Sequence, residues 1–151
     1  MTLAVSRAAV TAFSLLVLSA CTTLVAPAGP AAEPVLEGRR WSLVALQGEA
    51  LAPNTPLPNV PYVELRDGRL AGRGGCNGIG ASYELDGSTL RLGKAVSTMM
   101  ACAEPTMALE HRFLQVFDQV SSWRGTDGGI EWLDADGHVL ASFSESIRAE
   151  P

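Results

Sequence analysis

Short stretches in which apolar and polar residues alternate, separated by turn-forming pairs, make up most of the chain after residue 38. Residues 81–85 and 89–92 alternate strictly, which is the period-two pattern of a half-buried strand. Asp-Gly, which suits the positive φ angles of tight hairpin turns, occurs at 67–68, 86–87, 127–128 and 136–137. The pattern therefore predicts a series of antiparallel hairpins.

The same criteria predict the other strands. The first is expected at residues 40–47. The later ones are expected at 62–66, 69–73, 81–85, 89–92, 96–100, 123–126, 130–133 and 138–143. Residues 50–61 contain four prolines, which are excluded from the interior of a sheet, so this stretch is predicted to be a loop.

One segment has helical periodicity instead. In residues 105–120 apolar side chains recur at helical spacing, at Leu109, Phe113, Val116, Phe117 and Val120. Glu110 lies among the residues expected on the polar side. The predicted fold is mainly β (α+β). It is a small antiparallel meander sheet, or a partly open barrel, with one amphipathic helix packed on it.

The N-terminus predicts export and lipidation. Residues 1–20 combine Arg7 with a short apolar stretch, as a secretory signal peptide does. The run Leu18-Ser19-Ala20-Cys21 resembles the bacterial lipobox, in which the Cys sulfur receives a diacylglycerol. Thr22 follows in place of Asp, which points to lipid anchoring at the outer membrane, on its periplasmic face. The alternative is an ordinary signal peptide with a coincidental Cys21.

The rest of the chain divides by composition. Residues 21–38 are rich in Ala and Pro and are expected to form a semi-rigid tether. The domain is expected at 39–143, and 144–151 is a polar tail. Without Arg7 the mature chain keeps ten basic residues against sixteen acidic ones, a net charge of about −6. Nucleic-acid binding, which needs basic side chains against phosphate, is therefore not expected.

Two cysteines remain after Cys21. An even number in an oxidising compartment predicts a disulfide between Cys76 and Cys102. Both lie near expected strand ends, so the separation of about 7 Å or less that a disulfide requires is plausible. Two buried free thiols are the alternative.

Other chemistries fit these residues less well. Soft ligands that would suit Cu(I) cluster at Met99, Met100, Cys102, Met107 and His111. However, adjacent Met99 and Met100 on a strand would face opposite ways, and Met100 would share the core-facing side with Val96. His111 is expected on the surface. No metal and no cofactor is predicted, although copper binding stays an alternative.

Catalysis and nucleotide binding are not predicted either. A cysteine thiol with His111 could form a nucleophile and base, but no Asn or Asp is placed to orient the histidine. The glycine-rich run 72–80 is not followed by Lys-Ser or Lys-Thr, and a strand comes next, so it predicts a bulged turn instead of a phosphate loop. Carboxylates that fall at turns or on outward positions are Glu64, Asp67, Glu84, Asp86 and Glu131.

Four blocks resemble a known family. They are Trp41-Ser42-Leu43, Gly72-Arg73-Gly74-Gly75-Cys76-Asn77, Thr98-Met99-Met100-Ala101-Cys102, and Glu110 with Phe113 in the expected helix. Over residues 39–143 this spacing resembles the META domain, and the motif positions are Gly75, Cys76, Asn77, Thr98, Met100 and Cys102. The resemblance implies a small antiparallel β domain with a helix. It also implies an envelope protein linked to heat and drug stress, with no established catalytic activity.

The expected function is therefore a non-enzymatic interaction or stress-tolerance module, anchored to the membrane through Cys21, with an envelope protein as partner. The alternative is a binder of a small hydrophobic ligand. Aromatic residues that would line its sheet face or barrel mouth, unless they pack in the core, are Trp41, Tyr62, Trp123, Trp132 and Phe143.

Overall fold

The computed structural model describes residues 35–52 and 60–146. The chain divides into two units, Met1–Ala31 and Ala32–Pro151, and the described residues all belong to the second. The expected signal peptide, Cys21, and most of the tether and the polar tail lie outside the described residues. Within them, no helix combines the length and the apolar character that crossing a membrane requires.

In the described part of the chain, ten strands form one antiparallel sheet. Their bounds are β1 Arg40–Leu46, β2 Glu49–Ala50, β3 Tyr62–Arg66, β4 Arg69–Arg73, β5 Gly78–Asp86, β6 Thr89–Leu92, β7 Val96–Ser97, β8 Ser122–Thr126, β9 Gly129–Leu133 and β10 Val139–Glu145. The Asp-Gly turns with their flanking stretches predicted β3, β4 and β6 with these bounds. The mainly β fold with one helix is confirmed.

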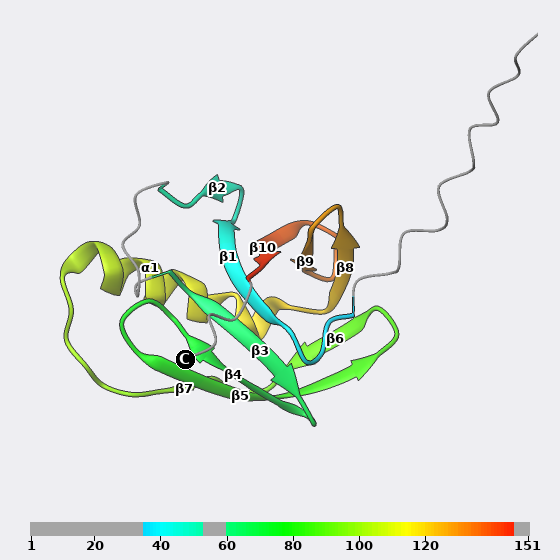
Figure 1. Ribbon diagram of the computed structural model, residues 1–151, viewed down its shortest axis with the longest axis horizontal. Coiled ribbons are helices and arrows are strands. Elements are labelled where there is room, and N and C mark those ends of the chain that lie inside the picture. The colour runs from blue at the N-terminus through cyan, green and yellow to red at the C-terminus, as the bar shows by residue number, and fades with distance from the viewer. Residues whose placement is uncertain (1–34, 53–59, 147–151) are drawn as a thin grey trace, which may run out of the picture. The chain divides into compact units, whose positions relative to one another are not determined.

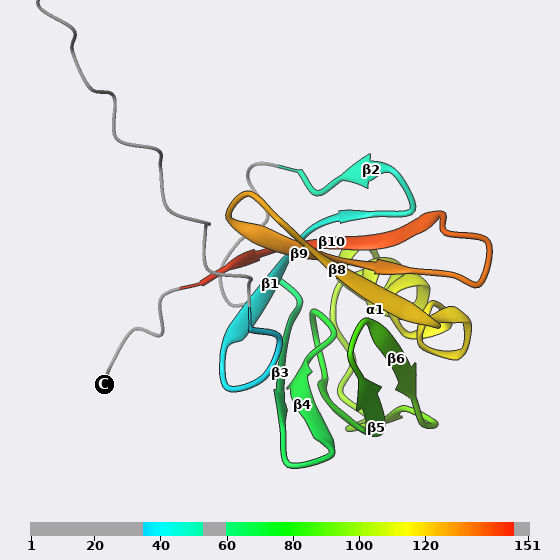
Figure 2. The ribbon, with the colours of Figure 1, turned by 90° about the vertical axis from the view of Figure 1, so that its right-hand side faces the viewer.

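The sheet closes on itself into a ring of strands (Figures 1 and 2). From β10 the order runs through β9, β8, β6, β5, β4 and β3 to β1, and β1 also pairs with β10. β2 continues from β1, and β7 pairs with β5 alongside this path. The pairing around the ring is shortest between β6 and β8, which share the single residue pair Thr89–Ser122.

Helix α1 (Glu104–Gln115) supplies the core with aromatic side chains. Phe113 is fully buried, and its ring centroid lies 6.2 Å from those of Trp132 and Phe143. The expected helix over 105–120 is interrupted at Val116, after which a 3₁₀ turn, η1, covers Phe117–Gln119. This break turns Phe117 edge-on to both Phe113 and Trp132.

Two hairpins have turns with positive φ at both central residues. Asp67 and Gly68, with φ of 50° and 75°, join β3 to β4 as the Asp-Gly pattern predicts. Gln47 and Gly48 join β1 to β2 with φ of 50° and 81°. The second turn lacks the Asp or Asn that usually marks this geometry. For this reason the sequence predicted that the first strand would include Gln47, whereas β1 ends at Leu46.

The packed unit extends past the expected bounds of 39 and 143. Leu36 is buried, and its carbonyl oxygen accepts a hydrogen bond of 2.8 Å from the indole N–H of Trp41. At the other end β10 continues to Glu145, and the backbone N–H of Ser146 donates to the carbonyl oxygen of Arg40 at 3.0 Å. The first extension supplies an acceptor for the buried indole N–H of Trp41. The second continues the hydrogen bonding between the end of β10 and the start of β1.

Candidate functional site

The two cysteine blocks and the helix meet at one place in the fold. Residues 74–77 join β4 to β5, and residues 98–103 lead from β7 to α1. The two buried polar residues of the described chain meet here: Asn77 (3% exposed), in the first segment, and Glu110 (4% exposed), on α1. We call Cys76, Asn77, Thr98, Cys102 and Glu110 the brace.

Glu110 ties α1 to the β4–β5 connection. Its Oε2 accepts hydrogen bonds from the backbone N–H groups of Cys76 (3.0 Å) and Asn77 (2.6 Å), and its Oε1 accepts one from Asn77 Nδ2 (2.6 Å). A Cβ atom on Gly74 would lie only 2.6 Å from Glu110 Cγ. The bulged turn predicted for the glycine run is therefore also the place where the helix approaches the backbone.

The expectation that Glu110 lies on the polar side of the helix is wrong. The carboxylate is buried because three donors from residues 76 and 77 meet it, a contact that helical periodicity cannot reveal. The available signal was its place in the family resemblance, beside the Gly-Gly-Cys-Asn block.

Asn77 holds the segment after β7. Its Oδ1 accepts hydrogen bonds from Thr98 Oγ1 (2.8 Å) and from the backbone N–H of Met100 (2.7 Å), while Nδ2 also donates to the Met100 carbonyl (3.3 Å). A side chain thus replaces a neighbouring strand as the hydrogen-bond partner. This explains why β7 ends at Ser97, although the sequence predicted a strand to residue 100.

Cys76 and Cys102 form the predicted disulfide, with Cα atoms 6.0 Å apart. The sulfur of Cys102 is therefore not a thiolate ligand for copper, nor a nucleophile for His111. His111 is exposed, as expected, and its Nε2 lies 3.0 Å from Gln115 Nε2. Together these contacts hold the segment after β7 and the helix α1 against the β4–β5 connection.

Exposed apolar side chains lie beside the brace, in β7 and the segment that follows it. Met99 is 98% exposed, Val96 68% and Met100 48%; we call these three residues the loop tip. The expectation that Val96 and Met100 face the core is wrong. Val96 pairs with Gly80 along the edge of β5, and its side chain is exposed; a Cβ on Gly80 would lie 3.7 Å from Val96 Cγ2.

A shallow groove of about 580 Å³ adjoins the loop tip on the outer face of the sheet. Its floor is made of small residues of β4 and β5, Ala71, Gly78 and Gly80, and Val96 forms one wall. At the opposite wall the Arg40 guanidinium carbon lies 4.2 Å from the ring centroid of Tyr62, and Arg40 Nε lies 2.7 Å from Glu64 Oε1. We call this the outer groove.

Among the aromatic and acidic candidates from the sequence, Tyr62 and Glu64 line the outer groove and the others do not. Trp41, Trp132 and Phe143 are buried in the core, whereas Tyr62 and Trp123 are partly buried. Exposed carboxylates, as expected, are Asp67, Glu84 and Asp86; Glu131 is partly buried and pairs with Arg124 at 2.6 Å.

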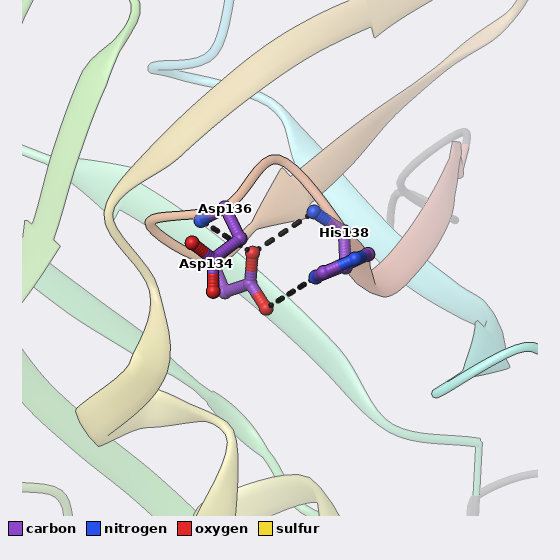
Figure 3. A group of neighbouring side chains, drawn as sticks. All are labelled: Asp134, Asp136 and His138. Atoms are coloured by element: carbon purple, nitrogen blue, oxygen red, sulfur yellow. Dashed lines mark hydrogen bonds and ion pairs between the residues drawn. The ribbon is translucent and has the colours of Figure 1, made fainter.

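A group of metal-ligating side chains occurs elsewhere in the described part of the chain. Asp134, Asp136 and His138 lie in the connection from β9 to β10, with their ligand atoms within 4.8 Å of one another (Figure 3). Asp134 Oδ1 accepts the backbone N–H groups of Asp136 and His138, each at 2.9 Å, and Oδ2 lies 3.2 Å from His138 Nδ1. The His138 backbone bond is the main reason that the pKa of Asp134 is lowered. The three side chains are close together because Asp134 stabilises the turn between β9 and β10 through these hydrogen bonds.

Comparison with known proteins gives both a family and a fold. A family model described as the META domain matches residues 34–147. A solved structure of a protein from Burkholderia xenovorans matches with a TM-score of 0.61 and 22% identity, covering 82% of this chain and all of that one. A DUF4847 family protein from Bacteroides vulgatus matches with a TM-score of 0.52 and 12% identity, over 73% and 94% of the two chains. None of the curated proteins matches. At these identities the solved structures show the fold alone.

Proposed function

The chain belongs to the META domain family, and on this premise we propose that its domain is a non-enzymatic binding module of the bacterial envelope. It binds a partner protein through the loop tip and the outer groove. The observation that carries the proposal is the nearly complete exposure of Met99 on a segment whose backbone is held by the brace.

The loop tip has the composition of a contact anchor. Fully burying a Val or Met side chain is worth about 1.5–3 kcal/mol, and flexible Met side chains adapt to different partner surfaces. In a protein–protein interface a few such residues supply most of the binding energy. Because Asn77 and the disulfide already order this segment, binding costs little conformational entropy there.

The outer groove suggests what kind of partner segment lies beside the tip. A floor of Gly and Ala lets another chain approach the sheet closely, and the charged groups at its wall, Arg40 and Glu64, neutralise each other. An uncharged, extended segment with apolar side chains complements this surface best. We therefore commit to such a segment of an envelope protein as the occupant.

Catalysis is not part of the proposal. Both cysteines of the domain are consumed by the disulfide, and the two histidines lie against Gln115 and Asp134. The residues that the family resemblance singles out thus support a fixed surface.

Membrane attachment completes the proposal. The Leu18–Cys21 motif supports lipidation of Cys21 and attachment at the periplasmic face of the outer membrane. Incorporation of labelled palmitate into the wild type but not into Cys21→Ser would support it. Equal labelling of both would contradict it.

Photo-crosslinking in cells tests the docking surface. A photoreactive residue at position 99 should give a discrete adduct, and one at Asp127, in the β8–β9 turn, should not. Val96→Thr should reduce the adduct, whereas the matched control Val35→Thr, at an exposed apolar site outside the tip, should leave it unchanged. An adduct that is insensitive to Val96→Thr, or equal from both positions, would refute the proposed surface.

The small-ligand alternative has one favourable observation, since the outer groove falls in the volume range of ligand sites. A thermal-shift assay with small compounds separates the two, and Gly80→Ala tests whether such a compound lies in the outer groove. The added methyl group makes only ordinary contacts, with the Leu70 carbonyl oxygen at 3.6 Å and Val96 at 3.7 Å. A thermal shift with amphiphilic compounds that Gly80→Ala abolishes would favour the ligand.

A further inference from the structure

We propose that Met99 is an oxidant-reactive site, which peroxides convert to methionine sulfoxide before the other described methionines and without loss of the fold. Its chemistry stands by itself. Only its consequence, a switch of the loop tip from apolar to polar, rests on the proposed function.

Accessibility sets the order of reaction. A thioether is oxidised when its sulfur can meet the oxidant, so susceptibility follows exposure. Met99 is 98% exposed and Met100 48%, both on the loop tip, whereas Met107 lies partly buried on α1. The expected order is Met99, then Met100, then Met107.

The reaction needs nothing beyond a hydroperoxide. The Met99 sulfur attacks one oxygen of the O–O bond, an S–O bond forms, and the O–O bond breaks. The sulfur loses two electrons and the peroxide gains them. The departing oxygen takes up the proton and leaves as water or an alcohol.

The brace explains why the fold tolerates this change. The residues on either side of Met99 are held by the side chain of Asn77, whose Oδ1 accepts hydrogen bonds from the Thr98 hydroxyl and the Met100 backbone N–H, and Cys102 is bonded to Cys76. None of these contacts involves the Met99 side chain, which projects into solvent. The new S=O group is therefore hydrated in the free protein and buries nothing.

In a complex the same group would have to leave water. An apolar partner cannot replace its hydrogen bonds, and the usual penalty for such a loss corresponds to about a tenfold weakening of binding. Oxidation of Met99 would thus release the partner while the domain stays folded. A methionine sulfoxide reductase would restore the surface.

Hydrogen peroxide titration of the full chain tests the proposal. Peptide mapping by mass spectrometry should find one added oxygen on Met99 first, with Met107 reacting last as the internal control. The urea midpoint should stay unchanged, as should that of the Met99→Leu control. Oxidation of Met107 at the same rate as Met99, or a lowered midpoint once Met99 alone is oxidised, would overturn it.

A second measurement separates the site from its consequence. The crosslink is repeated from a photoreactive residue at position 96, with Met99 reduced or oxidised. If Met99 oxidises first and the crosslink falls about tenfold, both proposals gain support. If Met99 oxidises first and a crosslink that depends on the tip is unchanged, the reactive site stands and the switch is refuted. If no tip-dependent crosslink forms at all, the proposed function fails and the oxidation site does not.

Discussion

Exchanging the polarity of the Asn77–Glu110 pair tests whether the brace works through its specific hydrogen bonds. Glu110→Gln keeps the shape of the side chain and replaces one carboxylate oxygen with an NH₂ group. If the remaining oxygen keeps the N–H groups of Cys76 and Asn77, the new NH₂ group faces Asn77 Nδ2, which in the wild type lies 2.6 Å from an acceptor. Asn77 cannot flip its amide to compensate, because Oδ1 already accepts from Thr98 and Met100.

The expected cost follows from these contacts. Leaving a buried donor without its acceptor costs about 1–3 kcal/mol, and two donors are set against each other here, so Glu110→Gln should lose about 3 kcal/mol. Asn77→Asp brings a second carboxylate against the first in a buried site and should lose about 3–5 kcal/mol. In the double variant the new amide NH₂ at position 110 can donate to the new carboxylate at position 77. Its loss should therefore be smaller than the sum of the two by about 2 kcal/mol or more.

Urea unfolding followed by tryptophan fluorescence, with the disulfide intact, measures these free energies. Glu84→Gln on the exposed side of β5 is the matched control and should stay within about 0.5 kcal/mol of the wild type. Additive losses in the double variant, within about 0.5 kcal/mol, would show that the two side chains do not act as a pair.

Three further predictions address the rest of the domain. Cys76→Ser with Cys102→Ser opens a loop of 26 residues and should cost about 3.5 kcal/mol in urea unfolding by the chain-entropy relation; no loss would mean that the hydrogen bonds of Asn77 and Glu110 order the loop without the disulfide. Burial and the hydrogen bond that Tyr83 donates to Glu37 raise the pKa of Tyr83 to about 12, so this contribution to stability is complete below about pH 10, the ordinary tyrosine pKa, and is lost as pH rises toward 12. Tyrosinate absorbance in Tyr62→Phe, which leaves Tyr83 as the remaining tyrosine, should show this late titration, and a midpoint near the ordinary value of about 10 would contradict it. Gly72→Ala would push a methyl group into the Tyr62 carbonyl and should lower the urea midpoint, whereas Gly80→Ala should fold like the wild type; equal midpoints would refute this reading of the β3–β4 pairing.

Local patterns in the sequence determined the individual elements. Alternation and the Asp-Gly pair were enough to predict β3 and β4 with their bounds, because a tight turn sets the register of the strands that flank it. The helix and its buried Phe113 were likewise predictable from spacing. The disulfide followed from compartment and the number of cysteines, and it did not need the fold.

Only the tertiary structure decided which of these residues form a site. Burial of Glu110 depends on donors that lie 33 and 34 positions away in the sequence. Exposure of Met100 depends on its backbone N–H bonding to the Asn77 side chain instead of to a neighbouring strand. Closure of the ring through β1 and β10 joins residues that are far apart in the chain, such as Trp41 and Glu145. Periodicity reports which face of an element is apolar, but it cannot report what that face meets. For this reason the sequence predicted the strands and the helix, while the brace, the loop tip and the outer groove exist only through long-range contacts.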